Sequence, residues 1–272
     1  MHERVTDCFE FSSGQTPLLI SIPHDGRDLP PEIALRMTER ARELPDTDWH
    51  VDKLYQFAKG MGAGVIKANY ARYVVDLNRA SSDETLYKDQ FTTGLCPLKT
   101  FDGEEIYLQD QHVNDAERRD RVEKYWLPYH DRITSALTSI KRTFGYALLW
   151  DAHSIPSNVP LLFDGELPEL NFGTNDGRSC AGDIVNAVTA EAALKAYSSV
   201  LNGRFKGGYI TRQYGDPAND IHAIQLELAQ RCYMIEETWS FDDDRATRLQ
   251  SALSGSLQTY ISSAASYYTG QE

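Results

Sequence analysis

Residues 146–150 form an uninterrupted apolar and aromatic run that ends in the polar sequence Asp-Ala-His-Ser. A run of this kind is typical of a strand that is buried on both faces, as in the central sheet of an α/β protein. In open α/β sheets, ligands bind beyond the carboxyl ends of the strands. The polar residues that follow Trp150, and His153 in particular, therefore mark a candidate site.

A second apolar run, residues 18–23, ends in the same way, in His24, Asp25 and Gly26. A single histidine after a strand is more often a loop residue than a ligand. Two buried strands that each deliver a histidine at their carboxyl end are typical of a metal site assembled by a sheet. His24 and His153 are therefore predicted to bind one metal ion.

The length of the chain suits one large α/β domain over residues 1–272, because no segment has the composition of a linker. Further strands are predicted at residues 63–68, 73–75, 198–201 and 221–228. Helices are predicted at residues 31–44, 115–144, 181–194 and 245–268, with another that begins at Asp48. The remaining long stretches are expected to be irregular: residues 80–108, 156–177 and 202–217.

Composition excludes several classes of partner. The formal net charge of −13 opposes binding to nucleic acid, and no apolar run approaches the roughly 20 residues of a membrane span. The first residues lack the pattern of a signal peptide, and the four cysteines are scattered without a C-x-x-C pair. A cytoplasmic protein with free thiols is expected.

Arginines are grouped at two places in this acidic chain. Arg72 and Arg79 flank one apolar segment, whereas Arg204 and Arg212 lie with Lys206 in a glycine-rich one. Such residues often form ion pairs with nearby carboxylates. Arginine also holds a carboxylate through two parallel hydrogen bonds, so the two groups are candidates for a pocket that binds a small anionic substrate.

Asp48 allows two interpretations. It precedes a predicted helix, where aspartate is a common N-cap. The alternative is a third metal ligand, since two histidines leave zinc short of the usual three protein ligands. His50, two residues further on, is a competing ligand.

Glu227 lies on a predicted strand with strict alternation, I-H-A-I-Q-L-E-L, which places it on one face with Ala223 and Gln225. The composition of this strand implies burial, and a buried carboxylate must be paired or take part in chemistry. Glu227 is therefore either a general base or the ion-pair partner of a buried arginine such as Arg72.

Together, the candidate residues are the components of a zinc amide hydrolase: two histidines, an aspartate, a buried glutamate and arginines at strand ends. The metal would polarise the scissile carbonyl and lower the pKa of its bound water to about 7. An unbound carboxylate would accept the proton of the water, and an arginine would stabilise the oxyanion.

Eight motifs occur between about residues 15 and 240: S-I-P-H-D-G, D-T-D-W-H-V-D-K-L-Y, R-Y-V-V-D-L-N-R, T-G-L-C-P-L, W-D-A-H-S, L-N-F-G-T, N-G-R-F-K-G-G-Y-I-T-R and I-Q-L-E-L-A-Q. Together they resemble the N-formylglutamate amidohydrolase (N-formylglutamate deformylase) family of histidine degradation. The resemblance implies a three-layer αβα fold with a mixed, mostly parallel central sheet, similar to that of the zinc carboxypeptidases and aspartoacylase (phosphorylase/hydrolase-like). It also implies a single divalent ion, with zinc the expected metal.

The resemblance assigns further roles. D-L-N-R resembles the aspartoacylase segment whose Asn and Arg bind the substrate carboxylate, here Asn78 and Arg79. Arg72 matches the carbonyl-polarising arginine that precedes it. Those relatives take two ligands from H-x-x-E, whereas Arg27 stands three residues after His24 in this chain. The second ligand must come from elsewhere in the chain; Asp48 is our choice, with another carboxylate or His50 as the alternatives.

The resulting hypothesis is hydrolysis of N-formyl-L-glutamate to formate and L-glutamate, the last step of a histidine degradation pathway. There are two alternatives: an enzyme that acts on another N-acyl acidic amino acid, and a protein that binds acidic amino acids without catalysis. The oligomeric state is left open. The predicted site comprises the catalytic Glu227 and Arg72, the substrate-binding Asn78, Arg79, Arg204 and Arg212, and the metal ligands His24, Asp48 and His153.

Overall fold

The central element of the fold is a seven-stranded sheet. The computed structural model describes residues 7–84, 93–193 and 197–270 of the 272-residue chain. The strands follow the order β1-β3-β2-β4-β7-β5-β6. Their bounds are β1 Phe9–Ser12, β2 Leu18–Ile22, β3 Gly64–Ala68, β4 Ala147–Ile155, β5 Leu170–Gly173, β6 Ser199–Leu201 and β7 Ile221–Ala229. Within the sheet, β1 runs antiparallel to β3 and β5 antiparallel to β7, whereas the other pairs are parallel.

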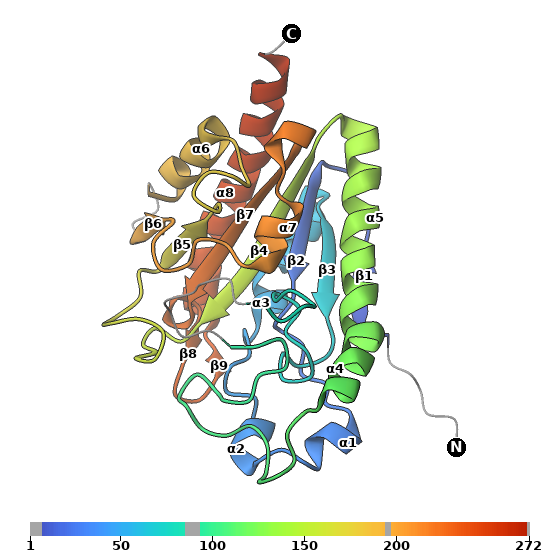
Figure 1. Cartoon of the computed structure of the whole chain (residues 1–272). Coiled ribbons are helices and arrows are strands. Elements are labelled where there is room, and N and C mark those ends of the chain that lie inside the picture. The colour runs from blue at the N-terminus through green and yellow to red at the C-terminus, as the bar shows by residue number, and fades with distance from the viewer. Residues whose placement is uncertain (1–6, 85–92, 194–196, 271–272) are drawn as a thin grey trace.

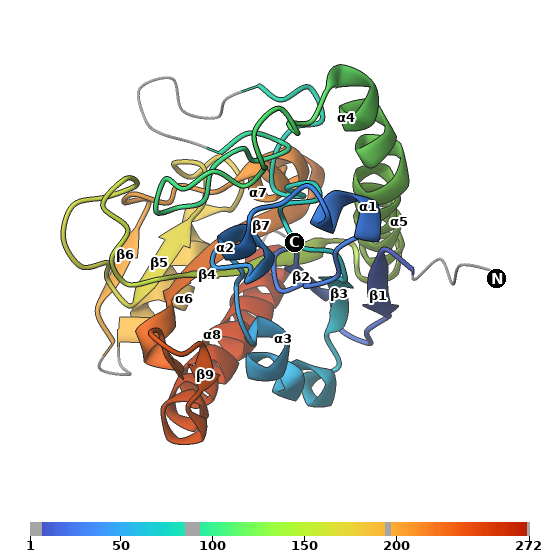
Figure 2. The same ribbon diagram turned by 90° about the horizontal axis from the view of Figure 1, so that it is seen from below.

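Helices cover both faces of this sheet. The α-helices are α1 Pro31–Ala34, α2 Glu39–Arg42, α3 Val51–Leu54, α4 Asp115–Arg121, α5 Leu127–Phe144, α6 Gly182–Ala193, α7 Tyr209–Tyr214 and α8 Asp243–Thr269. Shorter elements are the 3-10 turns η1 Gln56–Met61, η3 Pro217–Asn219 and η4 Gln230–Cys232, the π-helical η2 Val122–Trp126, and the hairpin of β8 Met234–Ile235 and β9 Ser240–Phe241. Helix α5 packs on one face, and α6 and α8 pack on the other (Figures 1 and 2). The predicted three-layer αβα fold with a mixed, mostly parallel sheet is confirmed.

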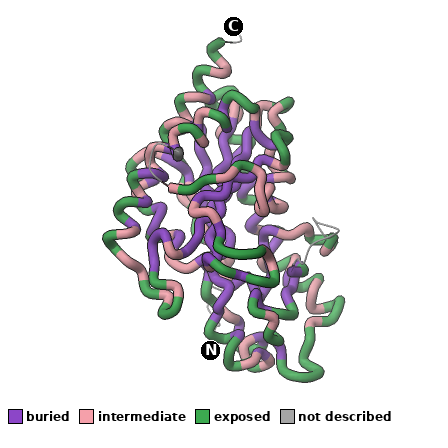
Figure 3. The backbone as a smooth tube through the Cα atoms, turned by 90° about the vertical axis from the view of Figure 1, so that its left-hand side faces the viewer, coloured by how far each residue is buried: buried purple, intermediate pink, exposed green. Residues whose placement is uncertain are grey.

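Strand β4 connects the two layers of the core. All nine of its residues are buried, and buried strands occupy the middle of the molecule (Figure 3). Because side chains alternate along a strand, Leu148 and Trp150 pack into the apolar cluster on the α6 and α8 side. Leu149 packs with α5 on the opposite side. The apolar run that organises the sequence therefore supplies both cores.

The strand expected to end at Trp150 continues through Ile155. The backbone of residues 151–155 pairs with β7 up to Ala229, so the polar side chains of Asp151 and His153 interrupt the apolar pattern without ending the strand. A strand was also expected at residues 73–75, and this prediction is wrong. These residues form a turn, in which Val74 N–H donates to the Ala71 carbonyl.

Several other predicted segments differ from the structure. Residues 31–44 form two single turns, α1 and α2, instead of one helix, and the helix expected from Asp48 begins at Val51. Two stretches expected to be irregular contain β5 and α7, respectively. In the expected loop at residues 80–108, positions 85–92 lie outside the described residues, and the described remainder contains no helix. The predicted helices at residues 115–144, 181–194 and 245–268 are confirmed as α4 to α5, α6 and α8.

None of the helices in the described ranges is long and apolar enough to cross a membrane.

His130 on α5 is a buried histidine that the fold keeps neutral. Its Nε2–H donates to the Leu77 carbonyl at 2.9 Å, and its ring stacks on Trp126. Burial lowers the pKa of His130 to about 3. The unfolded chain, with a histidine pKa near 6.5, therefore takes up a proton in a range of pH where the folded chain does not.

This difference predicts an acid-sensitive contribution to stability between about pH 6.5 and pH 3. The contribution is complete above pH 6.5 and falls by about 1.4 kcal/mol for each pH unit below it. We expect His130→Gln to remove this contribution, so that the free energy of unfolding changes less between pH 7 and pH 5 than it does in the wild type. Urea unfolding at the two pH values measures this change. His112→Gln, at a half-exposed position, is the control and should keep the wild-type slope. Equal slopes for all three proteins would contradict the prediction.

Candidate active site

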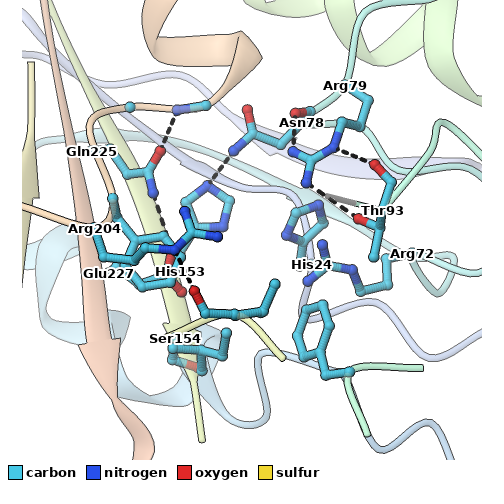
Figure 4. Close-up of a pocket in the computed structure, with 16 residues that line it drawn as sticks. His24, Arg72, Asn78, Arg79, Thr93, His153, Ser154, Arg204, Gln225 and Glu227 are labelled. Carbon is cyan, nitrogen blue, oxygen red and sulfur yellow. Dashed lines mark hydrogen bonds between the residues drawn. The ribbon is translucent and has the colours of Figure 1, made fainter. Parts of the chain in front are cut away.

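A cavity opens where the carboxyl ends of β2, β4 and β7 meet, at the lower edge of the sheet in Figure 1. Seven of the nine predicted site residues line it: His24, Arg72, Asn78, Arg79, His153, Arg204 and Glu227. Their side chains converge on the space around the two histidines (Figure 4). Asp48 is buried beneath the cavity, and Arg212 lies outside its wall.

His24, Asp48 and His153 form a buried cluster that could hold a metal ion, with one ligand atom of each residue within 4.8 Å of the others. The Oδ2 atom of Asp48 lies 3.2 Å from Nδ1 of His153 and 3.8 Å from Nδ1 of His24. Asp48 does not cap the helix, because α3 begins at Val51 and its N-cap is His50. The carboxylate of Asp48 instead accepts a hydrogen bond from Ser154 N–H at 3.1 Å.

The donor atoms of this cluster fit a divalent cation. The Oδ1 atom of Asp48 is buried and accepts no hydrogen bond from the described residues. The Nε2–H of His24 donates to Asp76 Oδ1 at 2.7 Å, which leaves its Nδ1 facing the cluster. The Nε2 of His153 lies 3.1 Å from Asp151 Oδ1, another buried oxygen without a hydrogen bond among the described residues. A metal-binding histidine is usually supported by a carboxylate next to the ring nitrogen that does not bind the metal.

The charge of the site also fits a cation. Four buried carboxylates lie around the two imidazoles: those of Asp48, Asp76, Asp151 and Glu227. Among the described residues, Arg72 supplies the buried guanidinium next to them. Burial acts to lower the pKa of His153, but Asp151 and Asp48 outweigh it, and this pKa lies well above its usual value. The surroundings thus favour positive charge at this point, as a metal ion would provide.

His50 is not part of the cluster. Its Nε2 lies 2.8 Å from the carbonyl oxygen of Trp239, at the tip of the β8–β9 hairpin. His50 has a positive φ of 64°, so the chain turns sharply between Asp48 and α3. This turn points Asp48 and His50 to different surroundings.

Arg72 is buried beside the cluster and is held by carboxylates. Its Nη2–H donates to Asp76 Oδ2 at 2.8 Å, and its Nη1 lies 3.7 Å from Asp48 Oδ1. Phe101 stacks on the guanidinium at 4.8 Å. No ion pair joins Arg72 to Glu227 among the described residues, so the predicted alternative of such a pair is wrong.

Asn78 and Arg79 follow Asp76 in a turn that Arg72 and His24 hold in place. Asn78 Nδ2 lies 3.0 Å from His153 Nε2, and its Oδ1 accepts a hydrogen bond from Ile210 N–H. Arg79 donates to the carbonyl and hydroxyl oxygens of Thr93 and to the carbonyl of Asn78. All these acceptors are neutral, so among the described residues no carboxylate is hydrogen-bonded to the guanidinium of Arg79.

Arg204 and Arg212 have different positions. Arg204 lines the cavity and donates from Nε to the Leu162 carbonyl. In the view of Figure 4 it lies on the opposite side of the histidines from Arg79. Arg212 on α7 donates to the Gly207 carbonyl at 2.7 Å and thereby holds a loop of the cavity wall.

Glu227 lies on β7 directly opposite His153 on β4. Its side chain is 7% exposed and lines the cavity. Burial raises the pKa of Glu227 to about 8, and the nearby Asp48 charge adds to this effect while His153 opposes it. A cation in the cluster would lower this pKa and favour the carboxylate form.

Sequence reasoning missed three residues of the site. Asp76 accepts a hydrogen bond from His24, Asp151 lies 3.1 Å from Nε2 of His153, and Gln225 lines the cavity beside Glu227. The signals were present: Asp76 opens the D-L-N-R motif, Asp151 lies two residues before His153, and Gln225 shares a strand face with Glu227.

The fold and the cavity place the chain among α/β proteins that carry a histidine–carboxylate cluster suited to hydrolysis at the carboxyl edge of the sheet. It belongs to the N-formylglutamate amidohydrolase family, whose sequence model matches residues 16–234.

Individual relatives agree with this assignment. The chain is 48% identical over 262 residues to N-formylglutamate deformylase of Pseudomonas putida, with 95% of this chain and 97% of the relative covered. It is 51% identical over 232 residues to N-formylglutamate deformylase of Pseudomonas aeruginosa, with 85% and 87% covered. The crystal structure of N-formylglutamate amidohydrolase from Ralstonia eutropha JMP134 has a TM-score of 0.80 at 26% identity, with 95% of this chain and 97% of that chain covered.

Proposed function

We propose that residues 1–272, as one catalytic domain, hydrolyse the formamide bond of N-formyl-L-glutamate to formate and L-glutamate. The observation that carries the proposal is a single cavity that combines a buried His–Asp–His cluster, the buried carboxylate of Glu227, and arginines. The names of relatives that are about half identical over most of the chain support the choice of substrate.

The substrate carries two carboxylates, and the cavity offers cationic anchors for both. Arg79 has its guanidinium oriented by Thr93 and Asn78, and it binds one carboxylate together with the amide of Asn78. Arg204 binds the other carboxylate. Arg212 acts indirectly, because it holds the Gly207 carbonyl in the wall.

His24, Asp48 and His153 hold one divalent ion, and their two nitrogens and one oxygen are a donor set that suits zinc. When bound, the ion polarises the formyl carbonyl and lowers the pKa of a water molecule. Asp76 keeps the imidazole of His24 in the required orientation, and the buried charge of Asp151 lies 3.1 Å from Nε2 of His153.

The protein's own groups then move the protons. Glu227 accepts a proton from the attacking water and later donates it to the nitrogen of the leaving glutamate. Arg72, fixed by Asp76 and Phe101, stabilises the negative charge that develops on the carbonyl oxygen. Glu227 and Arg72 are both buried, so bulk water does not weaken their electrostatic interactions with the substrate.

In the cell, this activity would complete a histidine degradation pathway in the cytoplasm. The partner of the protein is then a small anionic amino-acid derivative, and neither nucleic acid nor a membrane is required. The acidic net charge of −13 agrees with this choice, because phosphate backbones would be repelled.

Release of the free amino acid by the purified protein tests the proposed substrate, because N-acetyl-L-glutamate would yield acetate and not formate. N-formyl-L-glutamate should be cleaved with a kcat/KM at least 100-fold above that for N-acetyl-L-glutamate and for N-formyl-L-leucine, which lacks the second carboxylate. Preference for N-acetyl-L-glutamate would establish the alternative of another N-acyl specificity. Tight binding without product would establish a binding protein.

Arg79→Lys and Arg204→Lys test the two anchors. Lysine keeps the charge but loses the planar pair of donors, so each variant should lower kcat/KM for N-formyl-L-glutamate 10- to 100-fold, about 1.5–3 kcal/mol. Arg118→Lys on the surface of α4 is the matched control and should keep wild-type kinetics. If both cavity variants also keep them, these arginines serve only the structure.

A further inference from the structure

Gln225 connects the carboxylate of Glu227 to the loop that precedes α7. It lies two residues before Glu227 on β7, on the same face of the strand, and is 3% exposed. Its Oε1 accepts a hydrogen bond from Gly208 N–H at 2.6 Å, and its Nε2–H donates to Glu227 Oε2 at 3.0 Å (Figure 4). Since a backbone N–H can only donate, the amide is oriented with its own donor toward Glu227.

The loop end of this connection is fixed by close packing. A Cβ atom at Gly208 would lie 2.3 Å from Asn78 Nδ2, so only glycine allows the loop to approach Asn78 this closely. Ile210 N–H donates to Asn78 Oδ1 at 2.8 Å, and Arg212 Nε–H donates to the Gly207 carbonyl at 2.7 Å. Gly208 N–H is therefore a rigid anchor for the Gln225 side chain.

We propose that Gln225 is a positioning residue that holds the carboxylate of Glu227 in the orientation needed for proton transfer. The inference rests on the proposed function, in which Glu227 is the general base. By binding Oε2, Gln225 restricts rotation of the carboxylate and leaves Oε1 as the oxygen that receives the proton. Displacement of a catalytic group by about 1 Å can lower a rate about 100-fold, so a single buried hydrogen bond is sufficient for such a role.

Gln225→Met tests the role, because methionine has a similar length and removes both hydrogen bonds. We expect kcat for N-formyl-L-glutamate to fall 10- to 100-fold, with KM changed less than threefold and bound metal unchanged. Gln250→Met on α8, where the amide donates to the Leu54 carbonyl, is the matched control and should keep wild-type kinetics. If Gln225→Met is insoluble, Gln225→Asn replaces it, since the shorter amide cannot span Gly208 and Glu227.

The same substitution in a Glu227→Gln background separates positioning from other roles. If Gln225 acts through Glu227, adding Gln225→Met should lower the residual kcat less than threefold. An equal loss in both backgrounds, or a higher KM with unchanged kcat, would overturn the proposal while the proposed function stands. Wild-type turnover by Glu227→Gln alone would remove the general base from the proposed function, and the role of Gln225 with it.

Discussion

Replacement of Glu227 by glutamine is expected to lower kcat by about 10²–10⁴-fold, the usual contribution of a general base. Glutamine has the same shape but cannot accept the proton of the attacking water. Glu227 is not a metal ligand in this account, and it lies opposite His153 on the neighbouring strand. Metal content and KM should therefore stay near the wild-type values. The measurements are steady-state formate release and metal analysis of the same preparation.

Glu236→Gln is the matched control for this variant. Glu236 accepts hydrogen bonds from Ser157 and from Arg231 N–H, away from the cavity. It should lower the melting temperature and leave kcat of the folded protein nearly intact. The same pattern for Glu227→Gln, a lower melting temperature with wild-type turnover, would show that Glu227 is a structural carboxylate.

Removal of either histidine of the cluster is expected to abolish metal binding at micromolar concentrations, and formate release with it. His24→Ala and His153→Ala each leave only two protein ligands, fewer than the three that zinc sites normally use. Loss of a supporting group alone weakens metal binding 10- to 100-fold, so loss of a direct ligand should exceed 100-fold. Metal content after dialysis, read by elemental analysis, is the measurement.

His50→Ala separates the cluster from the competing ligand in the sequence. His50 lies against the Trp239 carbonyl, so this variant should keep one metal ion per chain. A circular dichroism spectrum like that of the wild type is needed for each alanine variant. Full metal occupancy in folded His24→Ala or His153→Ala would refute the assigned ligands, and metal loss in His50→Ala would point to His50 instead.

Much of the fold could be predicted from local patterns. Residues 18–23, apart from Ser21, and residues 146–150 are apolar runs, and they contribute β2 and the first part of β4 to the sheet core. The long helix expected at residues 115–144 forms as predicted, with a π-helical segment between α4 and α5. Such elements are specified by their own periodicity, so tertiary context has little to change.

Other elements depend on partners that are distant in the sequence. β5 has only four residues and exists because it pairs with β7, more than 50 residues later. Residues 151–155 stay in β4 for the same reason, although their polar side chains indicate an end of the strand. Residues 73–75 look like a strand, yet Arg121 of α4 binds the carbonyls of Tyr73 and Val74.

The residues of the candidate site also divide into those that local sequence could predict and those that depend on distant parts of the chain. His24 and His153 could be selected because each follows an apolar run, and alternation placed Glu227 on one face with Gln225. The hydrogen bonds from Gln225 to Gly208 and Glu227 could not be predicted, since they depend on a loop from another part of the chain. Arg212 could not be separated from Arg204 by sequence, because only the position of α7 decides which of them lines the cavity.

Titration of the metal-depleted protein with zinc, followed by formate release from N-formyl-L-glutamate, tests whether catalysis depends on one bound metal ion. We expect no measurable turnover after removal of the metal by a chelator. Activity should then rise in proportion to bound zinc and reach its maximum at one ion per chain, as a single cluster of three ligands requires. Wild-type rates of formate release from protein with no bound metal would show that hydrolysis needs no metal ion.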